Sequence, residues 1–208
     1  KENYYILATG LIEKVFKEPV VIISSFKGDK LVGLEYNPPF TYNYQMTDKP
    51  YKIVGDSYVT ETDGTGIVHL SPPFGEDDYR VCLANGIITK ESKLFLPLNI
   101  NGFVSADIPE FEGMFYKNYK DKTKEDLNTK VVKMLKEKGF YFEKKQIIHN
   151  YPFCWRSDTP LIYRAISSWF VKVEDMKERM VELNKEINWF PKHVGENRFS
   201  SWLANARD

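Results

Sequence analysis

The sequence holds only two cysteines in 208 residues, and it has no long run of apolar residues. So few cysteines argue against a disulfide-stapled fold and favour a reducing compartment, and nothing here reads as a signal peptide or a membrane-spanning helix. Net charge is absent too, because 29 basic residues balance 29 acidic ones. A chain without net charge has no overall field that attracts a polyanion, so we do not expect a general nucleic-acid binder. Local contact with one nucleic-acid end remains compatible with this charge. We therefore expect a cytoplasmic protein that binds neither membranes nor DNA.

What is present suffices for a globular core, since 42% of the residues are apolar and 15% are aromatic. The length allows one large domain, or one domain with an appendage. A nucleotide-binding loop is not indicated, because neither the Rossmann glycine spacing nor a Gly-Lys-Ser/Thr ending occurs. The chain starts at Lys1 rather than at methionine and stops within a helical pattern, so we expect an excised piece of a longer protein.

The first half of the sequence reads mainly as short strands joined by tight turns. The β-rich runs are residues 4–8, 20–24, 31–34, 51–54, 57–59 and 66–70. Runs of this length, closely spaced, favour a closed or partly closed barrel. We expect an α+β fold in which peripheral helices surround a β-barrel-like core.

Two helices are predicted beside this core. The first covers residues 77–84, with Asn85 and Gly86 suited to a C-terminal cap, and the second covers residues 124–138, with Gly139 following it. A strand-like run at residues 140–148 then leads to a helical tail. We place a boundary near His149, between a core at residues 1–148 and a return segment at residues 149–208.

Residues 64–83 combine turn signals with titratable side chains. A Gly-Thr-Gly turn leads into a β-branched apolar run, a Pro-Pro-Phe-Gly loop follows, and two aspartates open a helix. This order places His69 at a strand end and Asp77 and Asp78 at a helix start. We expect a pocket between His69 and Asp78.

Strand alternation groups the side chains around His69. Residues 67, 69 and 71 point one way, and residues 66, 68 and 70 point the other. His69 therefore shares a polar face with Ser71, whereas Val68 and Leu70 are expected to face the core.

Taken alone, these residues also fit ordinary structural roles. Asp78 can be a helix cap or a partner of the helix dipole, His69 can satisfy a backbone carbonyl, and residues 64–66 can be only a turn. If Asp77 caps the helix, however, Asp78 is left to project toward the loop, where a carboxylate suits a cationic amino group.

The stretch GTGIVHLSPPFGEDDY resembles the signature of the editing domain inserted into isoleucyl-tRNA synthetases, with the cytosolic and archaeal branch as the best match. Supporting blocks are Tyr-Asn-Pro-Pro-Phe-Thr-Tyr at residues 36–42, Tyr-Pro-Phe-Cys-Trp-Arg at residues 151–156 and Ser-Trp-Phe-Val at residues 168–171. In the related valyl enzymes lysine usually stands where His69 stands here, and in the leucyl enzymes methionine does.

The resemblance implies hydrolysis of mischarged valyl-tRNA(Ile) by an aminoacyl-tRNA deacylase, within an enzyme that charges tRNA(Ile) with isoleucine. Asp78 matches the aspartate that holds the α-ammonium of the aminoacyl group. His69 matches a histidine whose bulk helps exclude isoleucine, with general base as its second role. Further substrate-binding residues are Gly64, Thr65, Gly66 and Ser71. The implied partners are the aminoacylated 3' end of tRNA(Ile), its valine or isoleucine moiety, and the rest of the synthetase chain.

No cofactor is expected in this piece, because ATP and Mg²⁺ belong to the catalytic domain of the parent enzyme. No zinc site is expected either: some relatives have Cys-Trp-Arg-Cys where this chain has Cys154-Trp-Arg-Ser157, and Cys82 reads as a buried helix residue. The family's threonine-rich peptide, which forms the opposite pocket wall, does not occur here, so weak hydrolysis is expected. Two alternatives stay open, a non-catalytic module that positions an RNA end and a valyl-type editing domain.

Overall fold

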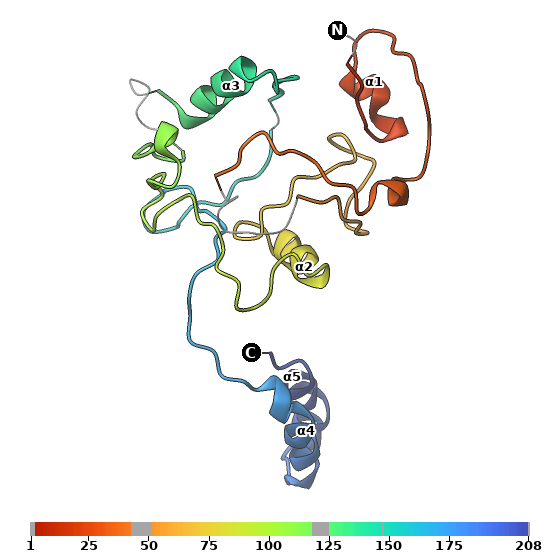
Figure 1. The fold of residues 1–208 in the computed structure, drawn as a ribbon. Helices are drawn as coiled ribbons and strands as arrows, with labels where there is room; N and C mark the ends of the chain where they lie inside the picture. The colour runs from red at the N-terminus through yellow and green to blue at the C-terminus, as the bar shows by residue number, and fades with distance from the viewer. Residues whose placement is uncertain (1–2, 43–50, 118–124, 147, 208) are drawn as a thin grey trace. The chain divides into compact units, whose positions relative to one another are not determined.

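The computed structural model describes residues 3–42, 51–117, 125–146 and 148–207. Its helical elements are η1 (Thr9–Leu11), α1 (Ile12–Val15), η2 (Gly28–Leu31), α2 (Glu76–Ala84), η4 (Pro109–Phe111), α3 (Leu127–Glu137), η5 (Glu174–Met176), α4 (Lys177–Glu186), η6 (Val194–Phe199) and α5 (Ser200–Ala204). The chain divides into two compact units, Lys1–Ala165 and Ile166–Asp208. Figure 1 labels α1, α2 and α3 in the first unit and α4 and α5 in the second. Within the described residues, no helix is long and apolar enough to cross a membrane.

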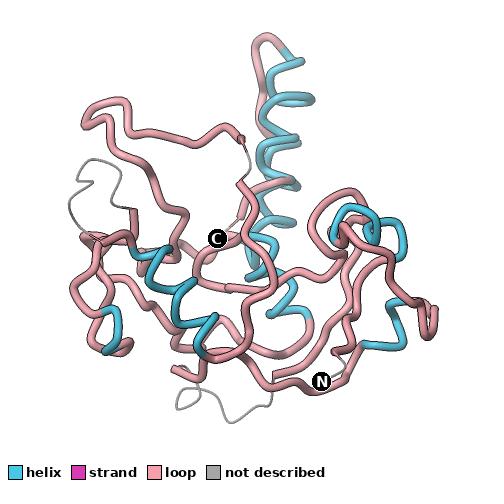
Figure 2. Tube along the Cα trace, turned by 90° about the horizontal axis from the view of Figure 1, so that it is seen from above, coloured by secondary structure: helices cyan, strands magenta, loops and turns pink. Residues whose placement is uncertain are grey.

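The predicted β-barrel-like core is wrong. Across the described ranges there is no strand, and Figure 2 shows helices joined by loops and turns. Backbone pairing there is confined to isolated bridges, such as Glu35 with Lys52 and Leu98 with Val104. β-Branched and aromatic residues suit a pleated, half-buried surface, but this preference does not supply the neighbouring strand that a sheet requires.

The run at residues 20–24 illustrates the missing partner. The next β-rich run along the chain, residues 31–34, pairs with another segment: the Gly33 N–H donates to the Ile53 carbonyl at 2.8 Å, and the Ile53 N–H donates to the Leu34 carbonyl at 2.9 Å. Among the described residues, residues 20–24 have no backbone hydrogen-bond partner, and Val21 is 88% exposed. The β-rich composition of this run favoured a strand, whereas strand pairing depends on contacts between residues that are distant in sequence.

Helix α2 confirms the prediction for residues 77–84. Three acidic residues occupy its first turn, where the positive end of the helix dipole stabilises them. At its other end, the Asn85 side chain donates to the Val81 carbonyl at 2.9 Å, and Gly86 takes a left-handed φ of 64°. Val81 and Cys82 are buried, so this helix contributes to the core of the first unit.

Helix α3 confirms most of the second helix prediction, but it starts at Leu127 rather than at Lys124, which lies outside the described residues. Asp126 caps the helix by accepting a hydrogen bond from the Thr129 N–H at 3.1 Å. Gly139 follows with a left-handed φ of 76°. Leu127 and Val131, one helical turn apart, line a cavity. Because the part of the chain that the structure describes forms no barrel, the predicted place of this helix beside a barrel core is wrong as well.

The second unit is held by a buried amide. Asn184, in α4, is 6% exposed; its Oδ1 accepts from Trp189 Nε1 at 2.9 Å, and its Nδ2 donates to the Gly195 carbonyl at 3.0 Å. Trp189 packs on the ring of Phe199, and Leu203 is buried. The contacts divide the chain after residue 165, while the boundary proposed near residue 149 stays a prediction.

Candidate functional site

The loop before α2 turns the chain so that the Asp78 carboxylate lies back over the start of the helix. The Ser71 N–H donates to Asp78 Oδ2 at 2.9 Å. The Phe74 N–H donates to the Ser71 carbonyl at 2.9 Å and closes the turn. Gly75 lies against the carboxylate, since a Cβ added there would stand 2.7 Å from Asp78 Oδ2. Asp78 is half-buried, so its carboxylate is held at the edge of the loop.

Tyr58 approaches the same carboxylate from a segment 20 residues earlier. Its hydroxyl donates to Asp78 Oδ1 at 3.4 Å, a long hydrogen bond. Burial raises the pKa of the Tyr58 phenol, and the negative charge of Asp78 raises it further. The phenol therefore remains a protonated donor to Asp78 at neutral pH.

Asp77 does not cap α2, so the condition under which Asp78 was expected to project toward the loop is not met. The N-cap residue is Gly75, and no side chain caps the helix there. Asp77 instead accepts a hydrogen bond from Arg80 Nη2 at 3.2 Å, three residues on, while Arg80 grips Asp56 with two hydrogen bonds of 2.9 Å. This Arg80 fork lowers the pKa of Asp56 to about 2. Asp77 and Asp78 thus have different partners.

His69 is exposed, and among the described residues its ring has no hydrogen-bond partner. The prediction that Val68 faces the core is wrong, because Val68 is 48% exposed and the strand that was to orient it is not formed. No hydrogen bond joins His69 to Asp78 in the described part of the chain. The substrate-contacting and size-gating roles of His69 stay predictions.

Residues 64–66 form the predicted turn. Gly64 and Gly66 take left-handed φ values of 69° and 75°, which side chains disfavour. The Thr65 carbonyl accepts from the Ala8 N–H at 2.8 Å, and Gly66 packs so closely on Ala8 that a Cβ atom would overlap it. The Thr65 hydroxyl donates to the Ile67 carbonyl at 3.2 Å, so contact with a substrate through this proton would require breaking that bond.

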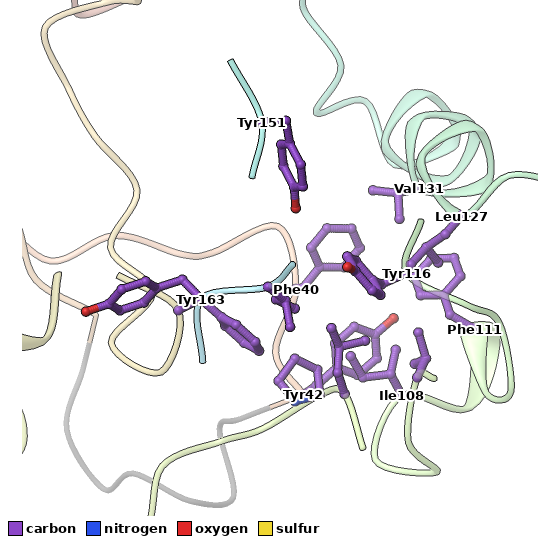
Figure 3. Close-up of a pocket in the computed structure, with 14 residues that line it drawn as sticks. Phe40, Tyr42, Ile108, Phe111, Tyr116, Leu127, Val131, Tyr151 and Tyr163 are labelled. Atoms are coloured by element: carbon purple, nitrogen blue, oxygen red, sulfur yellow. The ribbon is translucent and has the colours of Figure 1, made fainter. Parts of the chain in front are cut away.

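An apolar cavity of about 530 Å³ lies within the first unit (Figure 3). It is lined by Phe40, Tyr42, Phe74, Pro97, Leu98, Val104, Ile108, Phe111, Tyr116, Leu127, Val131, Tyr151, Ile162 and Tyr163. The hydroxyls of Tyr116 and Tyr151 donate to the backbone carbonyls of Pro160 and Leu161 at 2.9 and 2.6 Å, so these rings line the cavity with their polar ends satisfied.

A second cavity, of about 1170 Å³, is bordered by Gly66 and Ile67 together with the N-terminal segment. Neither cavity is lined by His69 or Asp78, so the pocket expected between these two residues is not one of them.

The two cysteines occupy contrasting environments. Cys82 is 2% exposed in α2, as predicted, and burial together with the nearby Asp78 charge raises the pKa of its thiol to about 11. A hydrogen bond with the Ser157 hydroxyl lowers the pKa of the Cys154 thiol. Throughout the described residues, no three histidine, cysteine or acidic side chains gather as a metal site would require.

Three residues around Asp78 escaped the sequence-based reasoning: Asp56, Tyr58 and Arg80. The Asp77 and Arg80 pair has the i, i+3 spacing of a helical ion pair and was therefore accessible to prediction. Asp56 and Tyr58 contact α2 only through the tertiary fold, and no local sequence pattern predicts that contact.

One family of known proteins matches this chain. The family described as "tRNA synthetases class I (I, L, M and V)" matches residues 77–208. The chain is 43% identical over 187 residues to the cytoplasmic isoleucine–tRNA ligase of Arabidopsis thaliana and 44% identical over 208 residues to the isoleucine–tRNA ligase of Rickettsia bellii. It is 39% identical over 213 residues to the cytoplasmic isoleucine–tRNA ligase of Saccharomyces cerevisiae.

These alignments cover 90%, 98% and 100% of the chain, but only 15%, 18% and 19% of the three relatives. The resemblance to isoleucyl enzymes is thereby confirmed. Cytoplasmic and bacterial relatives match alike, so the cytosolic and archaeal branch is not singled out.

Proposed function

Because the chain belongs to the class I tRNA synthetases of the I, L, M and V group, we propose that it is the editing part of an isoleucine–tRNA ligase. Its substrate is valyl-tRNA(Ile), whose ester bond it hydrolyses. The whole enzyme charges tRNA(Ile) with isoleucine using ATP and Mg²⁺, and it works in the cytoplasm.

The need for such a step follows from the size of one methylene group. Isoleucine and valine differ by that group alone, which is worth only about 1–3 kcal/mol of discrimination in an apolar pocket; this pair of amino acids is the standard example. A synthetic site therefore accepts some valine. A second site that excludes the larger amino acid and hydrolyses the smaller one removes the error.

The observation that carries the proposal is the carboxylate of Asp78. It is half-buried, and each of its oxygens accepts one hydrogen bond, from Ser71 and from Tyr58. A carboxylate oxygen accepts two hydrogen bonds, so each oxygen keeps one site for an ammonium group. A carboxylate with free acceptor sites suits the α-ammonium of an aminoacyl ester. The partial burial of Asp78 strengthens such an ion pair, because screening by water is reduced there.

The proposed chemistry is attack of water on the aminoacyl carbonyl. The new C–O bond gives valine, the ester C–O bond breaks, and the ribose hydroxyl of tRNA leaves with a proton. Asp78 orients the substrate by its ammonium, which makes it a binding group rather than the base. His69 is proposed to lie beside the amino-acid side chain and to limit its size. Hydrolysis consumes only water, and we propose no cofactor for it.

A second candidate, a non-catalytic module that positions the 3' end of tRNA, has an observation in its favour. His69 is exposed, and neither His69 nor Asp78 lines either cavity described above. The valyl-type alternative has less support, because the relatives reported above are isoleucine–tRNA ligases.

Deacylation of valyl-tRNA(Ile) by the full-length enzyme tests the proposal. We expect Asp78→Ala to abolish this reaction while aminoacylation with isoleucine stays nearly intact. Asp77→Ala is the matched control, since its carboxylate is the exposed neighbour and points to Arg80. Equal loss of deacylation and aminoacylation in Asp78→Ala, or undiminished deacylation, would refute the assignment. Threonyl-tRNA as the preferred substrate would instead indicate valyl-type editing.

A further inference from the structure

We infer that Tyr58 is a positioning residue for Asp78, and that the ion pair between Asp56 and Arg80 holds Tyr58 in place. The inference rests on the proposed function, since Asp78 is the group proposed to bind the substrate ammonium. It extends the site to Asp56 and Tyr58, which precede α2 by about 20 residues.

The two hydrogen bonds to Asp78 reach different oxygens. The Ser71 N–H donates to Oδ2 at 2.9 Å, and the Tyr58 hydroxyl donates to Oδ1 at 3.4 Å. One donor alone leaves the carboxylate plane free to turn about its Cβ–Cγ bond, because terminal torsions of this type are broad. A second donor on the other oxygen restricts that rotation. At 3.4 Å the Tyr58 bond is long, so its effect is on orientation more than on stability.

Tyr58 is tied to α2 by a closed ring of contacts. Arg80 Nη1 and Nη2 each donate to one oxygen of Asp56 at 2.9 Å. Asp56 Oδ1 also accepts from the Tyr58 N–H at 3.1 Å, and the Arg80 guanidinium lies 6.0 Å from the centre of the Tyr58 ring. The ring starts at Arg80 in α2 and returns to α2 at Asp78. A two-pronged pair of this geometry fixes both position and direction.

The same contacts hold the positive charge of Arg80 against Asp56 and Asp77 rather than against Asp78. The guanidinium of Arg80 is paired with Asp56 and with Asp77, so it does not compete with a substrate ammonium for Asp78. Tyr58 contributes a neutral donor, and its phenol pKa is raised. Asp78 is thus oriented without having its negative charge neutralised.

The test uses the full-length enzyme and two substrates. The first is valyl-tRNA(Ile); the second is the same tRNA carrying the α-hydroxy analogue of valine, which has no ammonium group. Tyr58→Phe is compared with Tyr163→Phe, the matched control, because the Tyr163 hydroxyl also donates at 3.4 Å to a carboxylate in the first turn of α2, that of Glu76.

For valyl-tRNA(Ile), we expect Tyr58→Phe to lower kcat/KM by about 2- to 3-fold through a raised KM, the low end of what one hydrogen bond contributes. On the hydroxy analogue this loss should disappear, because Asp78 then has no ammonium to bind. Tyr163→Phe should match the wild type on both substrates. A merely structural role for Tyr58 would lower both reactions alike.

The outcomes separate the two levels of inference. If deacylation depends on Asp78 but Tyr58→Phe equals the wild type, or loses as much on the analogue, the positioning role is overturned and the proposed function stands. If the wild type does not deacylate valyl-tRNA(Ile), or Asp78→Ala retains the rate, both are overturned.

Discussion

Gly75 and Asp78 are in direct contact across the start of α2: a Cβ atom added to Gly75 would stand 2.7 Å from Asp78 Oδ2. The φ of Gly75 is −143°, an extended conformation that any residue adopts. Backbone freedom is therefore not the reason that glycine fits here. Its role is to leave room for the carboxylate.

The first prediction follows from this contact. Gly75→Ala should displace the Asp78 carboxylate from the Ser71 N–H, because the added methyl group occupies its place. We expect deacylation of valyl-tRNA(Ile) by the full-length enzyme to fall about 10-fold or more, while aminoacylation with isoleucine stays nearly intact. Gly28→Ala is the control, since a Cβ atom there meets nothing within 4 Å. Unchanged deacylation in Gly75→Ala would show that the carboxylate is not needed where it lies.

The success of sequence-based prediction here follows the range of the interactions involved. The start of α2 and its end at Asn85 and Gly86 depend on groups within one or two turns of the helix, and these were predicted closely. The same holds for the turn at residues 64–66, where the structure adds the left-handed φ values of Gly64 and Gly66. Each of these features can be read from adjacent residues.

The errors concern partners distant in sequence. Several runs that were read as strands are not extended, because Leu31 ends η2 and residues 32–33 and 57–58 lie in turns. A barrel also requires each run to have a neighbouring strand, whereas residues 33–36 exchange only a few backbone hydrogen bonds with residues 51–53. The contact of Tyr58 with Asp78 spans 20 residues and carries no local signal. The partners of Asp77 and Arg80 were only partly accessible to prediction: their own contact has the local i, i+3 spacing, whereas the two hydrogen bonds from Arg80 to Asp56 are set by the tertiary fold.

The role of His69 is open to a direct test. If its ring limits the size of the substrate, His69→Ala should enlarge the site, so that the full-length variant begins to hydrolyse correctly charged isoleucyl-tRNA(Ile). If the ring is a general base, hydrolysis of valyl-tRNA(Ile) should instead fall by about 10²-fold, with no new activity. Deacylation rates of both charged tRNAs distinguish these results. Unchanged rates on both substrates would leave His69 with neither role.

Acid should weaken the attachment of Tyr58 to α2. The pKa of Asp56 is lowered from 3.8 to about 2 by Arg80, so its folded form favours the carboxylate. Because the pKa of Asp56 is lower in the folded state than in the unfolded state, its carboxylate stabilises the fold fully at pH values above the unfolded-state pKa. This contribution is lost as pH falls from about 4 through about 2. Urea unfolding between pH 2 and pH 5 checks this for the wild type and for Asp56→Asn. The two stability curves should converge as pH falls, and a constant offset would contradict the prediction.

The second unit offers a prediction that is independent of function. Asn184 is 6% exposed and serves two partners at once, Trp189 Nε1 and the Gly195 carbonyl. Asn184→Ala removes both hydrogen bonds and leaves two partly or fully buried polar groups without them, which costs about 1–3 kcal/mol for each group. We expect the unfolding transition followed by tryptophan fluorescence to move to lower urea concentration by a corresponding amount.

The matched control is Asn205→Ala. The Asn205 side chain also donates to a backbone carbonyl of its own helix, that of Ser201 at 2.7 Å, but it does so at an exposed position where water can replace it. Its loss should therefore cost well under about 1 kcal/mol. Equal shifts in the two variants would mean that burial of Asn184 adds nothing, and that the pairing with Trp189 and Gly195 does not hold the second unit together.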